Sequence, residues 1–394
     1  MRWTGLFALA AAGCVDHKAG LTGTQSIGVD LVSPALPGDI DHRLPLGATT
    51  VTVNLTAYDA DHQVDTSFNG QLQIYVQFLG TLTPSLDDAP LDTVQLVDGK
   101  AMAKVVTLPQ VYGPTTIWVD DGKNAEPTYA TGNSPALWYP DPHIVDLQRP
   151  KLETALDALV ASPLQNKQIA VDSSRYGAVG RLVVTSVFAQ GYTVSDVQCS
   201  DVDGRPPCTT EAYNHVVVFS FSAPADQNGR LLEQGQMIDG FAGGISEFNG
   251  LTEIGFPVTF ASNTEINPAR LPVPVKLDKA TWFNPLNDPN GEINFERNEA
   301  APIEIDDAAV CNLDQDYDRF KQWKLDLTGE GGDCSAKRNL VNVVTAGVIA
   351  NFDPATLSGK KFSRVVGVVK PVVTSSGPIW IIFPRTSADL TLVP

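Results

Sequence analysis

The chain has 394 residues, of which 43% are hydrophobic, and it carries a formal net charge of −18 with a pI of about 4.6. This hydrophobic fraction supports packed cores and excludes a largely disordered chain. A strongly negative chain repels phosphate backbones and anionic lipid headgroups, so nucleic acid is not an expected partner. Glycine and proline total 60 residues (32 plus 28). Together with many short alternating apolar runs, they predict an all-β protein.

The first 13 residues predict a secretory signal peptide. Arg2 precedes a largely apolar run from Trp3 to Ala12, and small residues lead up to Cys14, as in segments that are cleaved after export. The run is far shorter than the ~20 residues that a membrane-spanning helix needs. The order Ala-Ala-Gly-Cys at 11–14 resembles the lipobox of bacterial lipoproteins.

This resemblance implies that Cys14 is acylated and becomes the first residue of the mature protein. Residues 14–27 would then form a lipidated tether, and the membrane would be a partner through the lipid anchor. Val15 follows the cysteine where an aspartate could stand, which in such lipoproteins favours the outer membrane, with the periplasmic or surface face left open. Cleavage nearby by an ordinary signal peptidase is the alternative.

Residues 28–139 are predicted to form a β-sandwich. Apolar side chains alternate over 51–57 and 72–78, and Asp98-Gly99 joins two further strands in a hairpin. The segments 57–70, 96–105 and 112–121 resemble bacterial immunoglobulin-like (Ig-like) domains. That resemblance implies a spacer or adhesive module without catalytic activity.

Residues 140–167 are predicted to be a proline-punctuated linker with one short amphipathic helix. Its apolar residues recur at helical spacing from Leu152 to Leu159, after Pro150 and before Pro163.

Residues 168–263 contain strands on either side of a Gln190-Gly191 turn and a further strand over 215–221. Together with the motif GGISEFNGLTEI at 243–254, they resemble the OB-fold-like domains that accompany some bacterial extracellular nucleases. The motif is expected to form one long bent strand, and no counterpart of the nuclease domain itself is present. Residues 264–394 are a second OB-like unit or an elaboration of the first.

The four cysteines beyond the signal form two locally spaced pairs. Local pairing of Cys199 with Cys208 and of Cys311 with Cys334 is the simplest of the three connectivities. Each bond would contribute roughly 2–4 kcal/mol in an oxidising compartment. Isolated buried thiols are the alternative.

Carboxylate clusters give a weak calcium prediction. Oxygen-bearing side chains alternate at Asn312, Asp314, Asp316 and Asp318, which suits calcium. The glycine and closing glutamate of an EF-hand loop are missing, however, so a solvated acidic loop is the favoured interpretation. The aspartates of 59–65 are interpreted in the same way as turn residues that bond to their own backbone.

Aromatic residues give a second weak prediction. Tyr176, Tyr192, Phe241 and Phe248 lie where an OB-like barrel could present a binding face. Core packing is the favoured alternative for each.

No recognised catalytic or cofactor motif occurs in the sequence. The five histidines do not stand at metal spacing, and GxSxG, P-loop and dinucleotide patterns are absent. The sequence therefore predicts a non-catalytic envelope or surface protein with a binding or scaffolding role, without a cofactor, whose partner is another envelope protein or a polysaccharide. The alternatives are an OB-type binding protein for polysaccharide or nucleic acid, and a hydrolase with an unrecognised site.

Overall fold

The computed structural model describes residues 23–47, 49–81, 89–122, 129–151, 161–282, 289–337, 339–374 and 377–394. The chain is all-β with a few short helices, as predicted. It forms two compact units that divide after Pro140, except that residues 80–84 belong to the second. The predicted signal peptide, Cys14 and the amphipathic helix around 152–159 lie outside the described residues. None of the described helices is long and apolar enough to cross a membrane.

The first unit is a sheet with strand order β5-β3-β7-β8-β1-β2-β6, in which β9 pairs with β7. Its strands are β1 (Ser26–Ser33), β2 (Thr49–Tyr58), β3 (Gln71–Phe78), β5 (Asp92–Gln95), β6 (Lys100–Leu108), β7 (Pro114–Asp120), β8 (Thr131–Asn133) and β9 (Leu137–Trp138).

Both halves of this sheet bury side chains in one core, the arrangement of a β-sandwich. Leu55 of β2, Ile74 of β3 and Ile117 of β7 are fully buried together. The alternation of the sequence produces this core because every second side chain of a strand points to the same face. The predicted hairpin forms at Asp98 and Gly99, whose φ angles are 50° and 74°, the left-handed conformation that such two-residue turns require.

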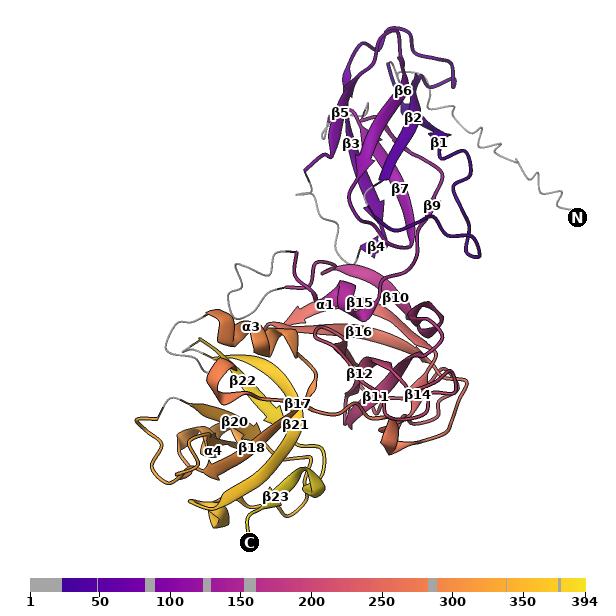
Figure 1. The fold of residues 1–394 in the computed structure, drawn as a ribbon. Helices are drawn as coiled ribbons and strands as arrows, with labels where there is room; N and C mark the ends of the chain where they lie inside the picture. Colours follow the sequence, from indigo (N-terminus) through magenta and orange to yellow (C-terminus); the bar gives the residue numbers. More distant parts are fainter. Residues whose placement is uncertain are drawn as a thin grey trace, which may run out of the picture. The chain divides into compact units, whose positions relative to one another are not determined.

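The second unit contains two closed barrels (Figure 1). The strands of the first barrel and its flank are β4 (Gly80–Thr81), β10 (Lys167–Asp172), β11 (Gly180–Phe188), β12 (Gly191–Gln198), β13 (His215–Phe219), β14 (Met237–Ile238), β15 (Gly240–Phe248) and β16 (Leu251–Phe260). The order is β14-β11-β12-β13-β16-β15-β10-β4, and β14 leads directly into β15 while pairing with β11. The ring therefore closes, with β13 and β16 as its parallel pair.

One detail of this barrel corrects the sequence prediction. The motif 243–254 is two strands, because the chain turns at Asn249 and Gly250, whose φ angles are 53° and 79°. Gly250 provides the left-handed turn of a hairpin rather than a bend within one strand.

The second barrel has the same connectivity. Its strands are β17 (Val275–Lys276), β18 (Pro302–Val310), β19 (Gln322–Asp326), β20 (Leu340–Val344), β21 (Lys361–Thr374), β22 (Gly377–Phe383) and β23 (Leu390–Leu392). The pairings β18-β19-β20-β22-β21-β18 close a ring, and only β20 and β22 are parallel within it. Residues 275–392 thus form a barrel of their own, although both barrels share one compact unit.

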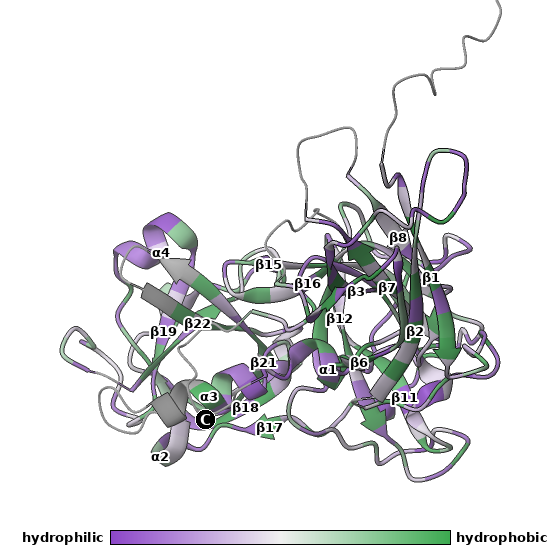
Figure 2. Ribbon diagram, turned by 90° about the horizontal axis from the view of Figure 1, so that it is seen from above, coloured by the Kyte–Doolittle hydropathy of each residue, from purple (hydrophilic) through white to green (hydrophobic). Residues whose placement is uncertain are grey.

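Short helices connect these strands: α1 (Ile144–Gln148), α2 (Lys279–Trp282), α3 (Pro289–Arg297) and α4 (Gln315–Phe320). Figure 2 shows hydrophobic residues along strands such as β1 and β11. Trp323 and Phe362 are buried in the core of the second barrel, with ring centroids 6.1 Å apart.

Candidate functional site

Three of the four aromatic residues singled out from the sequence are core residues. Tyr176, Tyr192 and Phe241 are only 8%, 1% and 0% exposed. Tyr192 of β12 and Phe241 of β15 are buried as inward-pointing side chains of a small barrel are, whereas Tyr176 stacks on His143 with ring centroids 4.4 Å apart. Phe248, next to the β15–β16 turn, is 61% exposed.

A different set of aromatic side chains is exposed on the first barrel. Phe221, just after β13, is 65% exposed and Phe256 of β16 is 81% exposed. The ring of Phe221 lies 5.2 Å from that of Phe219 and 5.2 Å from that of Phe256, measured between centroids. Further along β16, Val258 and Phe260 are 48% and 44% exposed. These five residues are called the phenylalanine ridge below.

A β-bulge positions the outermost ring. The register between β15 and β16 shifts between Ala242 and Gly244, and Phe256 has a φ angle of 50°. A Cβ atom at the intervening Gly243 would lie 2.7 Å from the carbonyl oxygen of Gly255, so the close approach of the two strands requires glycine there. A left-handed conformation is a genuine outlier for a bulky residue, and an exposed ring gains no burial energy. Such strain is typical of functional positions.

The backbone beside the ridge is closed to an additional strand. β13 pairs with β16 only as far as Gly255. Beyond that point Pro257 has no N–H to donate, and the amide of Gln227 donates to the carbonyl of Thr259 at 2.8 Å. Proline and capped carbonyls are the usual means by which strands avoid edge-to-edge pairing. The ridge therefore offers side chains rather than backbone groups.

A buried cluster of glutamates lies where the two barrels of the second unit meet. The Oε1 atom of Glu299, between α3 and β18, accepts hydrogen bonds from the amide of Thr252 in β16 at 3.0 Å and from Gln148 of α1 at 3.2 Å. The hydroxyl of the same threonine donates to Glu247 of β15 at 2.8 Å. Glu296 and Glu299 are 4% and 3% exposed.

Burial makes these carboxyl groups hold their protons. Burial, followed by repulsion from Glu247, raises the pKa of Glu296 to about 8, and burial raises the pKa of Glu299 well above its ordinary value. Burial likewise lowers the pKa of the neighbouring Lys370 to about 8. Among the described residues the Oε2 atom of Glu296 has no hydrogen-bond partner. The cluster therefore keeps its protons to higher pH than exposed carboxyl groups do, so the charge at this contact within the unit depends on pH.

A serine–histidine pair in the first barrel bears on the hydrolase alternative. The hydroxyl of Ser195 lies 2.7 Å from Nδ1 of His215, a distance suited to activation of a nucleophile. Both residues are 0% exposed, and burial lowers the pKa of His215 to about 3. No substrate reaches a fully buried hydroxyl, so this pair contributes to the core rather than to a reaction site.

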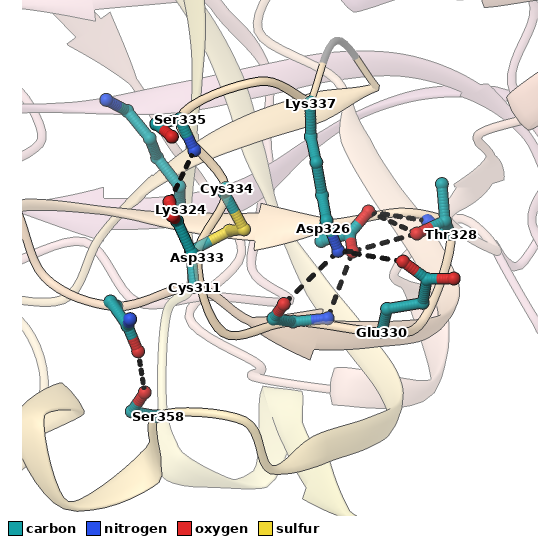
Figure 3. The surroundings of a disulfide bond; sticks show 12 residues. Cys311, Lys324, Asp326, Thr328, Glu330, Asp333, Cys334, Ser335, Lys337 and Ser358 are labelled. Atoms are coloured by element: carbon teal, nitrogen blue, oxygen red, sulfur yellow. Dashed lines mark hydrogen bonds and ion pairs between the residues drawn. A yellow bond between two sulfur atoms is a disulfide. The ribbon is translucent and has the colours of Figure 1, made fainter.

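The residues of the weak calcium prediction are engaged in other contacts. Asp314 caps α4, and the ammonium of Lys324 lies 2.6 Å from both Asp314 and Asp316. Asn312 accepts a hydrogen bond from Ser358 (Figure 3), and Asp318 lies within α4. The ammonium of Lys324 thus already pairs with the two carboxylates. In the residues that the structure describes, no three or more His, Cys, Asp or Glu side chains are grouped to hold a metal ion.

The other acidic candidates, in the first unit, are turn residues, as the favoured interpretation held. Asp59 accepts hydrogen bonds from the amides of Asp61 and Gln63, both at 2.9 Å. Asp65 accepts from the amide and hydroxyl of Ser67. These bonds lie within two successive turns and fix their backbone conformations.

Both locally spaced cysteine pairs are disulfide-bonded, Cys199 to Cys208 and Cys311 to Cys334. Beside the second bond, the fully buried carboxylate of Asp326 pairs with Lys337 at 2.5 Å and accepts from the amide of Gly331 at 3.0 Å (Figure 3). Two disulfides indicate an oxidising, extracytoplasmic compartment.

Comparisons with known proteins identify no relative of this chain. A scan against protein-family models finds no match, and searches of curated proteins and of solved structures find none either. The function is therefore argued from the ridge and its surroundings.

Proposed function

We propose that this chain is an exported binding or scaffolding protein of the cell envelope, anchored through a lipid on Cys14. The first barrel would hold its partner on the phenylalanine ridge. The observation that carries the proposal is Phe256, which is 81% exposed and held in a left-handed conformation. The exposure of this ring does not help the isolated chain to fold, and exposed apolar clusters commonly mark interaction sites.

The place of the ridge in the barrel supports the same reading. OB-type barrels commonly bind ligands along their second and third strands. In the ring of the first barrel these strands are β12 and β13, and the ridge begins at Phe219, the last residue of β13. The amide of the next residue, Ser220, donates to Gln190 in the turn between the first two strands at 2.8 Å. The start of the ridge at the end of the third strand supports the proposal, and the ridge continues on the fifth strand, β16.

The direct test is site-specific photo-crosslinking in cells. A photoreactive residue at position 256 is compared with one at position 320, since Phe320 of α4 is also 61% exposed but belongs to the second barrel. We expect a discrete adduct from position 256, identified by mass spectrometry and lost in Phe221→Ser. Adducts of the same mass and yield from both positions, or none from position 256, would overturn the proposal.

A further inference from the structure

We infer that the phenylalanine ridge binds a basic amphipathic helix of a partner protein, laid against its side chains. This inference rests on the proposed function and names the partner of that same surface. Three features of the first barrel carry it: the closed backbone edge, the absence of polar atoms on the ridge, and the acidic groups beside it.

The closed edge excludes the commonest way in which a sheet captures a peptide. Strand addition needs free backbone donors and acceptors along an edge. Pro257 supplies no donor, and the carbonyl of Thr259 is already taken by the amide of Gln227 at 2.8 Å. The partner must therefore contact side chains, as a helix does when it lays an apolar stripe on a complementary surface.

The length of the ridge fits such a helix. From Phe256 to Phe260 the strand advances four residues, about 13 Å at the usual rise. A helix that contributes residues i, i+4 and i+7 to a contact covers about 10 Å at 1.5 Å per residue. Three apolar anchors on two helical turns would therefore cover most of this row.

The chemistry of the ridge disfavours a sugar. Its five side chains, those of Phe219, Phe221, Phe256, Val258 and Phe260, carry no hydrogen-bonding atom. Sugar sites combine aromatic faces with polar groups that meet the hydroxyls. Among the neighbouring hydroxyls, that of Thr259 is buried and bonded to Tyr192 at 2.7 Å, and that of Ser220 donates to the carbonyl of Ser222 at 2.7 Å, while Ser222 is exposed. The ridge suits an apolar surface instead.

The acidic residues beside the ridge indicate that the partner's charge is positive. The amide of Asp239 donates to the carbonyl of Phe260 at 2.7 Å, and Asp172 pairs in register with Gly240, which pairs with Phe260. Both aspartates are exposed. Arg230, whose guanidinium also donates to the carbonyl of Ala261, is paired with Asp226 at 2.5 Å.

A net charge of −18 also makes a second copy of the chain, or an anionic membrane, repel this surface. A helix with lysines or arginines flanking its apolar stripe matches both the apolar ridge and the acidic residues beside it.

Binding of synthetic peptides to the purified mature chain tests the inference. Three 14-residue probes are compared by fluorescence anisotropy: an amphipathic leucine–lysine helix, its leucine–glutamate counterpart, and a leucine–lysine sequence scrambled to lose the stripe. We expect only the first to bind, with affinity that falls as salt rises and that drops about tenfold or more in Phe256→Asn. Asparagine tolerates the left-handed conformation, so this variant keeps the fold.

Control variants separate the outcomes. Phe320→Ser should leave binding unchanged, whereas Asp172→Asn with Asp239→Asn should weaken it and flatten its salt dependence. Equal binding of the acidic or scrambled peptide, or binding that survives Phe256→Asn, overturns the inference. Binding of phosphatidylcholine vesicles that requires Phe256 also overturns it, because the partner would then be a membrane. If position 256 still crosslinks in cells while the basic helix fails to bind, the proposed function stands, and the inference that the partner presents a basic amphipathic helix is wrong.

Discussion

Replacement of Glu296 by glutamine should stabilise the second unit, and increasingly so as the pH rises. Burial raises the pKa of this carboxyl to about 8 from an ordinary value of 4.5. The folded state therefore binds a proton that the unfolded chain has already released in this interval. Stability falls as the pH rises from about 4.5 to about 8, because folding then requires either proton uptake or a buried charge. Glutamine keeps the shape of the protonated side chain and cannot ionise.

The size of the effect follows from the same values. A tenfold change in proton affinity corresponds to about 1.4 kcal/mol, so the interval from 4.5 to 8 sets an upper limit of about 5 kcal/mol. Glu247 and Glu299 share the environment and respond to the change. Their adjustment reduces the gain, and we expect a difference of roughly 2–4 kcal/mol at pH 9 and less than about 1 kcal/mol at pH 5.

The assay is urea unfolding at a series of pH values, read by hydrogen exchange of residues 300–310, which include β18. Glu233→Gln is the matched control, because Glu233 is exposed. It should shift stability by less than about 0.5 kcal/mol at every pH. If Glu296→Gln changes stability equally at pH 5 and pH 9, or lowers it at pH 9, the reasoning about the cluster is wrong.

Three further changes test other parts of the structure. Phe256→Asn should raise the free energy of unfolding of the isolated chain by about 1 kcal/mol, measured by denaturant unfolding, because asparagine adopts the left-handed conformation at lower cost than phenylalanine. An unchanged or lower free energy of unfolding would show that Phe256 is not strained. Lys337→Met should lower the free energy of unfolding by about 3–5 kcal/mol, since the buried carboxylate of Asp326 loses its ion-pair partner. Lys360→Met, at an exposed position, is the control. Equal losses of stability in the two variants would contradict this prediction. Cys14→Ser should move the protein from the membrane fraction to the soluble fraction on fractionation; retention in the membrane rejects the anchor.

The strands could be predicted from the sequence because their signals are local. Alternation placed β2 and β3, and the Asp98-Gly99 pair placed a hairpin that the structure contains. The disulfides were also predictable, since short spacings favour local pairs. The β15–β16 turn was missed because Asn249-Gly250 was interpreted as a bend rather than as a two-residue turn. That dipeptide is among the strongest hairpin signals, so the information was present.

The ridge was not predictable from alternation alone. Phe219 and Phe221 have the spacing of one face of a strand, which indicates a buried row as readily as an exposed one. Pro257 was the available signal, because a proline within a strand pattern marks an edge or a bulge. The glutamate cluster was equally hidden, since any pair of carboxylates is uninformative in a chain with 45 acidic residues. Only the fold shows that Glu296 and Glu299 are buried.

A single strand carries both features that oppose stability. In β16, Thr252 binds two glutamates of the cluster, and Phe256 lies one residue beyond the last pairing with β13. The bulge separates the two segments, so the first part of the strand is fixed by the junction of the barrels and the second part turns its side chains outward. Selection for folding alone would bury the phenylalanines and replace the glutamates with apolar residues. That one strand contacts the cluster through Thr252 and carries Phe256 is best explained if the junction holds the ridge in place for a partner.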